Sequence, residues 1–252
     1  MRAEHPTAEQ VPQLRRLWKE AFGDTDAFLD LFFTLAYHPD HCCCMGTQGR
    51  VTAALYWLDM FCNGQKIAYI YAVATAADCR GQGLCRQLMG DTAELLKQRG
   101  YRGALLVPQD EGLRTMYGRM GYGDGAPIDE FFCAAGNAPI PVSGISAEAY
   151  ASLRSAYLPR DSVEPGAEAL AFLGAMARFY TGDGVLAAAS REPDHLRILE
   201  YLGDRSKIPG LIAALGATEA TVRTPGNSRP FAMYLPLTAD CAAPDYYPFA
   251  FD

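Results

Sequence analysis

The sequence lacks long apolar runs and basic clusters. No stretch of 18 or more apolar residues occurs, and the opening MRAEHPTAEQ is charged and polar, without the apolar core of a secretory signal. Lysine and arginine total 22 against 29 aspartate and glutamate, a formal net charge of −7, and no basic residues are interleaved with aromatics. We therefore expect a cytoplasmic protein that binds neither membranes nor nucleic acid.

Metal-binding and nucleophile patterns are also missing. The run HCCC at 41–44 has no CxxC partner, and successive residues of a strand point to opposite faces, so buried thiols fit it better than zinc. No signal peptide or regular framework supports disulfides, and the scattered histidines form no hydrolase constellation. We expect reduced cysteines and no metal; the positions are Cys42, Cys43, Cys44, Cys62, Cys79, Cys85, Cys133 and Cys241 for cysteine, and His5, His38, His41 and His195 for histidine.

The sequence is rich in apolar residues, and their spacing predicts a series of helices and strands. The hydrophobic fraction of 50 % over 252 residues suffices for one large domain or two modest ones. Thr7 and Gln10 have capping-box spacing, Gly23 is a plausible helix end, and Asn63-Gly64 suits a type I′ hairpin turn. The first part of the chain is predicted to contain helices over 7–23 and 24–37, three antiparallel strands over 41–48, 50–61 and 66–75, a helix over 83–99, a strand over 103–109 and a helix over 111–120.

A second region follows a stretch rich in proline, glycine and serine at 136–146, which indicates a domain boundary. The strand at 103–109 is expected to lie parallel to the strand before the 83–99 helix, by the right-handed crossover rule. Beyond the boundary the order strand, strand, helix, strand repeats that of the first part without its glycine-rich turn, which favours a degenerate structural repeat. The predicted elements there are a helix over 166–180, strands over 184–190 and 195–203, a helix over 206–216, strands over 220–225 and 230–237, and an aromatic tail over 246–252.

The glycine-rich turn RGQGLC at 80–85 lies between a strand and a helix. Its backbone N–H groups and the positive end of the helix dipole can converge on a phosphate, Arg80 can add charge, and Gly81 and Gly83 allow close approach. The pattern is neither GxGxxG nor GxxxxGK[ST], so a dinucleotide fold or a nucleoside-triphosphatase loop is disfavoured. Another pyrophosphate is the expected ligand, with an ordinary tight connection as the alternative.

With AVATAADCRGQGLCRQL at 72–88 and DEGLRTMYGRMGYG at 110–123, the sequence resembles the GCN5-related N-acetyltransferase (GNAT) superfamily. Arg80 and Gly83 match that superfamily's pyrophosphate loop, and Cys85 stands where its pattern has glycine or alanine. The enhanced-intracellular-survival branch, with a second degenerate acetyltransferase-like domain, is the most similar. The resemblance implies an α/β (α+β) fold: a GNAT acetyl-CoA-binding domain at 1–135 with a mixed, mostly antiparallel sheet, and a smaller degenerate GNAT-like α+β domain at 145–252.

The resemblance also implies where acetyl-CoA, the co-substrate, would bind. The backbone from Val73 through Ala74 to Thr75 would hold the pantetheine arm, and the turn would hold the pyrophosphate through Arg80, Gly81, Gln82, Gly83, Leu84, Cys85 and Arg86. Asp110 and Glu111 come where cofactor and active site meet in that family, although acids at a helix start more often cap it.

Two residues are candidates for proton transfer. By the resemblance, Tyr117 protonates the departing CoA thiolate, with a packed core aromatic as the alternative, and the Asp252 α-carboxylate acts as base or amine anchor, with a purely structural tail as the alternative. The expected function is an acetyl-CoA-dependent N-acetyltransferase acting on a primary amine of a small molecule or peptide. The other hypotheses are a non-catalytic acyl-CoA-binding sensor or interaction module, and an acyltransferase acting on a hydroxyl or with another acyl-CoA.

Overall fold

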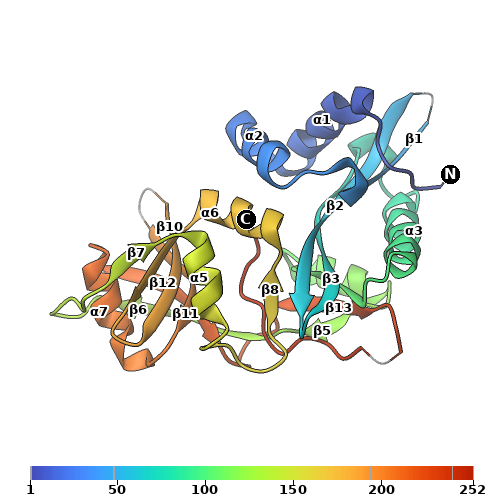
Figure 1. The fold of residues 1–252 in the computed structure, drawn as a ribbon. Coiled ribbons are helices and arrows are strands. Elements are labelled where there is room, and N and C mark those ends of the chain that lie inside the picture. Colours follow the sequence, from blue (N-terminus) through green and yellow to red (C-terminus); the bar gives the residue numbers. More distant parts are fainter. Residues whose placement is uncertain (1, 48, 193–194, 240, 252) are drawn as a thin grey trace. The chain divides into compact units, whose positions relative to one another are not determined.

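The computed structural model describes residues 2–47, 49–192, 195–239 and 241–251. The chain forms two compact units, each assembled from separate segments. The first comprises Met1–Gly123, Gly166–Phe172 and Met233–Ala242, and the second comprises Asp124–Pro165, Leu173–Ala232 and Ala243–Asp252. Both contain a mixed sheet, so the chain is α/β with two sheets (Figure 1).

The first unit is built on a sheet in which its strands follow the order β1-β2-β3-β4-β13, with β5 next after β13. The first three strands form the predicted antiparallel meander, and β4 runs parallel to β3, as the crossover rule predicted. Strand β13, from much later in the chain, pairs antiparallel with β4. The bounds are β1 (Cys42–Thr47), β2 (Arg50–Cys62), β3 (Gln65–Thr75), β4 (Gly103–Leu106) and β13 (Ala232–Pro236), and β5 (Gly123–Gly125) lies at the boundary between the units.

Local sequence signals explain where several of these elements begin and end. The Gln10 side chain accepts a hydrogen bond from the Thr7 backbone N–H at 2.9 Å, and Gly23, with a φ of +75°, ends the following helix. Asn63 and Gly64 both have positive φ in the β2–β3 turn, as the type I′ prediction requires. The helices of this unit are α1 (Val11–Phe22), α2 (Asp26–Leu35), α3 (Leu84–Gln98) and α4 (Glu111–Gly118), with short 3-10 turns at Ala8–Gln10, Pro39–His41 and Ala77–Cys79.

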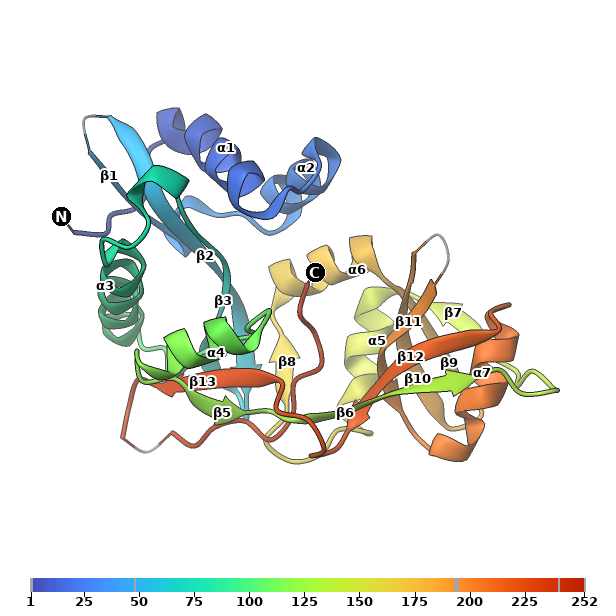
Figure 2. The same cartoon turned by 180° about the vertical axis from the view of Figure 1, so that it is seen from behind.

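Both faces of the first sheet are covered. Trp18 of α1 packs on Tyr56 of β2, with ring centroids 4.9 Å apart, while Trp57 points to the opposite face and joins a core with Leu88 and Leu96 of α3. The ribbon accordingly shows α1 and α2 on one side of the strands and α3 on the other (Figure 1). Helix α4 contributes Tyr117 to the core on the α3 side and lies beside β13 (Figure 2).

The second unit has the strand order β6-β12-β11-β10-β9-β7. Strands β10 and β11 are antiparallel, α7 follows, and β12 returns parallel to β11, so the predicted strand, strand, helix, strand order is confirmed. The elements are β6 (Ile128–Ala134), β7 (Ser143–Ile145), α5 (Ala147–Arg154), β8 (Val163–Pro165), β9 (Arg178–Gly182), β10 (Val185–Glu192), β11 (His195–Leu202), a 3-10 turn at Arg205–Lys207, α7 (Ile208–Ala214) and β12 (Glu219–Pro225).

The units are interleaved along the chain, which differs from the single boundary at 136–146 that the sequence indicated. Strand β13, expected in a domain at 145–252, completes the first sheet, and Gly166–Phe172 at the start of α6 (Ala167–Met176) also belongs to the first unit. Hydrophobic periodicity tells which residues are buried and does not tell which sheet they join, so the sequence could not place β13. No helix among the described residues is long and apolar enough to cross a membrane.

Candidate functional site

The candidate site begins where β3 parts from its neighbour. Strand β4 pairs with β3 only at Ala68–Ala104 and Tyr69–Leu105. From Ala72 to Thr75, β3 has no strand on that side among those the structure describes. The backbone edge is therefore open to an extended ligand, which could add its own hydrogen bonds as a strand would.

A β-bulge lies at the same place. Ala54 pairs with Ala74 while Tyr56 pairs with Tyr71, so Leu55 faces two residues of β3. Ala72 takes a φ of +48° to make this bulge, a left-handed conformation that is uncommon for a residue with a side chain. Such a bulge interrupts the regular ladder of hydrogen bonds between the two strands. The sequence has no glycine at this point that would have indicated the bulge.

The glycine-rich turn follows directly and leads into α3. Gly81 and Gly83 have φ of +73° and +80°, and a Cβ built on either would meet no atom within 4 Å. These glycines are therefore required for their backbone conformation and not for lack of space. All of Gly81–Gly83 is solvent exposed, so the turn is accessible to a ligand.

The start of α3 presents uncapped N–H groups. Gly83 is the N-cap and offers no side chain, and the first intrahelical bond goes from the Gln87 N–H to the Gly83 carbonyl oxygen. The N–H groups of Leu84, Cys85 and Arg86 precede that bond and have no intrahelical acceptor. Together with the helix dipole they form a site suited to an anion.

Arg80 and its neighbours hold the turn in place. The Arg80 Nε donates to the Thr75 carbonyl oxygen at 3.1 Å, so the side chain that was expected to meet the anion also closes the turn onto β3. Asp78 is held by Arg50 through two hydrogen bonds of 2.6 and 2.8 Å, and Arg50 lowers the pKa of that carboxyl to about 2. Asp78, the one acid of the 3-10 turn Ala77–Cys79, is therefore ionised, and Arg50 compensates its negative charge. This compensation reduces the repulsion that a negative ligand would meet on approaching the glycine-rich turn. Gln82 donates through its amide nitrogen to the Asp78 carbonyl oxygen at 3.4 Å.

Tyr117 lies in the core beneath this region. It is 7 % exposed, and its ring packs edge-on against Tyr122 at a centroid separation of 5.9 Å. Burial, with a smaller contribution from Cys85, raises the pKa of Tyr117 well above its usual value, so the phenol is protonated at neutral pH and able to donate.

The two acids after β4 have local roles. The Asp110 carboxylate accepts the Leu113 N–H at 2.7 Å and caps α4, and the exposed Glu111 lies 3.6 Å from Arg114 on the same helix. These contacts match the helix-capping alternative. A role of either acid toward a cofactor stays a prediction.

The aromatic tail is an integral part of the second unit. Tyr246, Tyr247 and Phe249 are at most 1 % exposed, and the Val163 N–H donates to the Tyr246 carbonyl oxygen at 2.9 Å. The Arg223 Nη1 adds a hydrogen bond of 3.0 Å to the Pro248 carbonyl oxygen. Asp252, whose α-carboxylate was the other catalytic candidate, lies outside the described residues.

Comparisons with known proteins concern the family and the fold. A family model described as acetyltransferase (GNAT) domain matches residues 2–125. No curated protein matches the sequence.

Solved structures are similar over most of the chain. A GCN5-related N-acetyltransferase from Kribbella flavida is 16 % identical with a TM-score of 0.72, covering 92 % of this chain and 70 % of that one. Another from Anabaena variabilis ATCC 29413 is 16 % identical with a TM-score of 0.72, covering 94 % and 73 %. Eis1 from Mycobacterium abscessus is 12 % identical with a TM-score of 0.65, covering 94 % and 73 %. At these identities the likeness establishes the fold.

Proposed function

From the membership of residues 2–125 in the GNAT acetyltransferase family, we propose that the protein is an acetyl-CoA-dependent N-acetyltransferase acting on a primary amine of a small molecule or peptide. The observation that carries the proposal is the open edge of β3 at Ala72–Thr75, followed at once by the uncapped N-terminus of α3. An extended acyl carrier with a diphosphate needs both features in this order.

The donors present fit such a ligand. The backbone of Val73, Ala74 and Thr75 offers hydrogen bonds to an amide-containing arm, and the N–H groups of the turn 80–86 offer them to a diphosphate. Arg80 and the exposed Arg86 add positive charge at the same end. Acetyl-CoA would supply the acyl group as a thioester.

The chain's own residues would then manage orientation and protons. The neutral amine attacks the carbonyl carbon, the new C–N bond forms as the C–S bond breaks, and Tyr117 donates its phenolic proton to the sulfur. The amine's proton passes to a base, for which we propose the Asp252 α-carboxylate. Holding both reactants in line supplies several kcal/mol by the general proximity argument.

The test is calorimetric titration with acetyl-CoA, comparing wild type with Gly83→Glu. The variant places a carboxylate at the helix start, so binding should weaken by at least about 100-fold. Gly100→Glu is a matched control, because Gly100 also has a φ of +80° and open space around it but lies after the other end of α3. Absence of binding by folded wild type would contradict the proposal, as would equal loss in both variants.

Binding alone does not separate an enzyme from a sensor. Free thiol released from acetyl-CoA in the presence of polyamines, aminoglycosides or lysine peptides should appear for at least one acceptor. If acetyl-CoA binds but none of the amines causes release of free thiol, a non-catalytic acyl-CoA sensor would be favoured. Thiol release with alcohols but not with amines would favour O-acylation.

A further inference from the structure

The glycine-rich turn depends on its two ends for its shape. Gly81 and Gly83 are exposed, carry no side chain and take left-handed φ values of +73° and +80°. Glycine has more backbone conformations open to it than other residues, so holding it in one of them costs more conformational entropy. The arrangement that presents N–H groups to an anion therefore depends on how the chain is held before and after these glycines.

The chain enters the turn through the 3-10 helix Ala77–Cys79, which has no cap of its own. The N-cap residue is Ala76, which has no side-chain oxygen to accept an N–H of this short helix. The Ala76 N–H donates to the Thr52 carbonyl oxygen at 2.8 Å, which ties this residue to β2. The Ala77 N–H, the first of the 3-10 helix, needs an acceptor from elsewhere in the fold.

That acceptor is a side chain of α1. Glu20 Oε1 accepts the Ala77 N–H at 2.9 Å, across 57 residues of sequence. The next residue, Asp78, is held from β2 by Arg50. Three successive residues at the entry are thus anchored, two of them from β2 and Ala77 from α1.

Helix α1 is itself fixed on the sheet. Near its start the Gln13 Oε1 accepts the Val51 N–H at 2.9 Å. Gln13 and Glu20 are seven residues apart, which is close to two helical turns, so both lie on the same face of α1. Trp18 is buried and packs on Tyr71, the residue before the bulge, with ring centroids 5.5 Å apart. The carboxylate of Glu20 therefore reaches the turn from a helix whose position is already set.

We propose that Glu20 is a positioning residue for the glycine-rich turn: by accepting the Ala77 N–H it fixes the entry to the turn and so strengthens binding of the diphosphate of acetyl-CoA, without itself contacting the ligand. The identity of the ligand rests on the proposed function, whereas the anchoring of the turn does not. A loop that is already held in its binding conformation loses less conformational entropy when the ligand arrives, so binding is tighter.

The charge of Glu20 and its hydrogen bond act on the ligand in opposite directions. A carboxylate near the turn repels an anion, so removing the charge alone should improve binding slightly. Removing the acceptor releases the Ala77 N–H and should weaken binding. Glu20→Gln removes the charge and keeps an oxygen acceptor, whereas Glu20→Ala removes both, so the two variants separate these effects.

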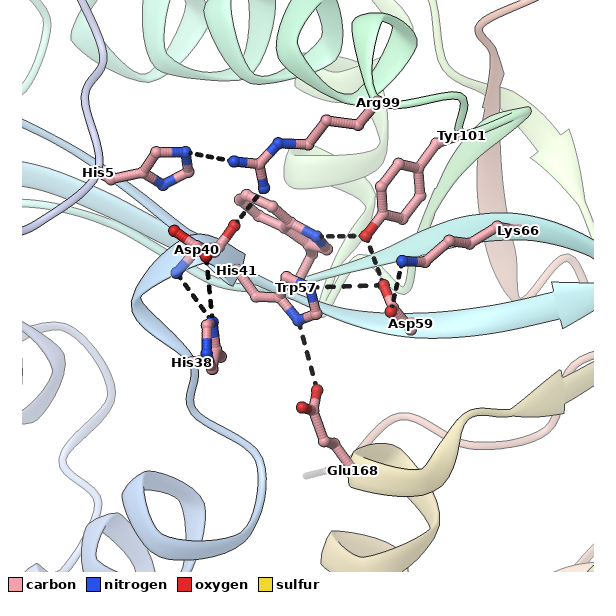
Figure 3. Close-up of polar contacts among 10 residues, drawn as sticks. All are labelled: His5, His38, Asp40, His41, Trp57, Asp59, Lys66, Arg99, Tyr101 and Glu168. Atoms are coloured by element: carbon pink, nitrogen blue, oxygen red, sulfur yellow. Dashed lines mark hydrogen bonds and ion pairs between the residues drawn. The ribbon is translucent and has the colours of Figure 1, made fainter.

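A second group of polar contacts in the first unit provides a control away from the turn. His41 lies 3.9 Å from Asp59 Oδ1 and 3.4 Å from Glu168 Oε2 (Figure 3). In the same view the Arg99 Nη1 donates to the Asp40 carbonyl oxygen at 2.6 Å, so this side chain also holds a distant backbone group. Arg99 is the C-cap of α3, whereas the glycine-rich turn precedes the first residue of that helix. Arg99→Ala therefore removes a similar contact at the other end of α3.

Steady-state kinetics and amide exchange test the proposal in the full-length protein. For Glu20→Ala, the KM for acetyl-CoA should rise about threefold, the size expected of one exposed hydrogen bond, while kcat stays near wild type. Exchange of the Ala77 amide hydrogen in the ligand-free protein, measured by NMR and corrected for intrinsic rates, should become at least about threefold faster. Glu20→Gln should keep wild-type exchange and a KM equal to or below that of wild type, and Arg99→Ala should change neither quantity.

The exchange measurement needs neither ligand nor activity. If wild type does not bind acetyl-CoA, the proposed function fails, and the Ala77 exchange rate still decides whether Glu20 fixes the turn. Wild-type exchange in Glu20→Ala, or a KM raised equally in Glu20→Gln or in Arg99→Ala, would overturn the proposal. Because Glu20 is exposed, the midpoint of thermal unfolding should be the same in both Glu20 variants, which separates a local effect on the turn from a general loss of stability.

Discussion

The guanidinium of Arg154 binds the carboxylate of Glu200 in the core of the second unit, with Nε–Oε2 at 2.7 Å and Nη2–Oε1 at 2.8 Å. Both side chains are at most 1 % exposed, and the Tyr150 hydroxyl donates to the same carboxylate. Arg154 Nη1 also donates to the Val163 carbonyl oxygen at 2.8 Å, and its guanidinium lies 5.5 Å from the ring of Phe249 in the C-terminal tail. The pair thus connects α5 to β11, to β8 and to the tail.

Removing the charge of only one partner of this ion pair should destabilise the second unit strongly. Glu200→Gln leaves a buried guanidinium without its counter-charge, so the free energy of unfolding should fall by about 3–5 kcal/mol in urea denaturation. The double variant Arg154→Met/Glu200→Leu removes both charges and should recover much of the loss. A single variant as stable as wild type would show that water reaches the pair.

Local signals in the sequence predicted much of the first unit. The Thr7–Gln10 spacing, the Asn63-Gly64 turn and the glycine-rich turn before α3 each depend on a few neighbouring residues, and the structure contains all three. The parallel pairing of β3 with β4 was predicted from the right-handed crossover rule alone, and the structure confirms it.

Features that depend on distant residues were not predictable. The bulge at Ala72 depends on the register between β2 and β3, and the close approach of Gly166 to β2 is recognisable only once Asp59 lies beside it. His41 was read as one of four scattered histidines because its neighbours Asp59 and Glu168 are far away in sequence. Such residues carry no local pattern, since their environment is created by the fold.

Replacing Arg80 tests the double role of its side chain. Arg80→Ala removes both the hydrogen bond to the Thr75 carbonyl oxygen and a positive charge beside the turn. The KM for acetyl-CoA should rise about fivefold, the size expected of a solvent-screened contact, and the difference should shrink at high salt. Lys97→Ala, in the last turn of α3, is the control and should leave KM unchanged. A KM that does not respond to Arg80→Ala would place the diphosphate elsewhere.

Removing one phenolic oxygen tests the proposed acid. Tyr117→Phe should lower kcat by about 10²-fold, the lower range of general acid catalysis, while acetyl-CoA affinity measured by calorimetry stays unchanged. Tyr122→Phe removes a hydroxyl from the adjoining buried ring and should keep kcat near wild type. Equal rates for Tyr117→Phe and wild type would leave Tyr117 as a packing residue.

The pH profile tests the protonation state of the same group. Because burial raises the pKa of Tyr117, the phenol remains protonated beyond the ordinary tyrosine value of about 10. The rate should therefore show no alkaline decline attributable to Tyr117 up to about pH 10, and ultraviolet titration should find a tyrosine ionising above that pH. A wild-type decline between pH 8 and 9 that is absent in Tyr117→Phe would contradict a raised pKa.

Deleting Asp252 separates a catalytic role of the final carboxylate from a structural role of the tail. The tail is buried through Tyr246, Tyr247 and Phe249, so removing one residue beyond them should leave the midpoint of thermal unfolding nearly unchanged. If the α-carboxylate accepts the amine's proton, kcat should fall at least about tenfold, and raising the pH should recover part of the rate because more of the free amine is then neutral. Asp252→Asn is the informative control, since it removes the side-chain charge, keeps the α-carboxylate and should retain activity. Full activity after the deletion would assign the tail to packing and send the search for the base to other residues.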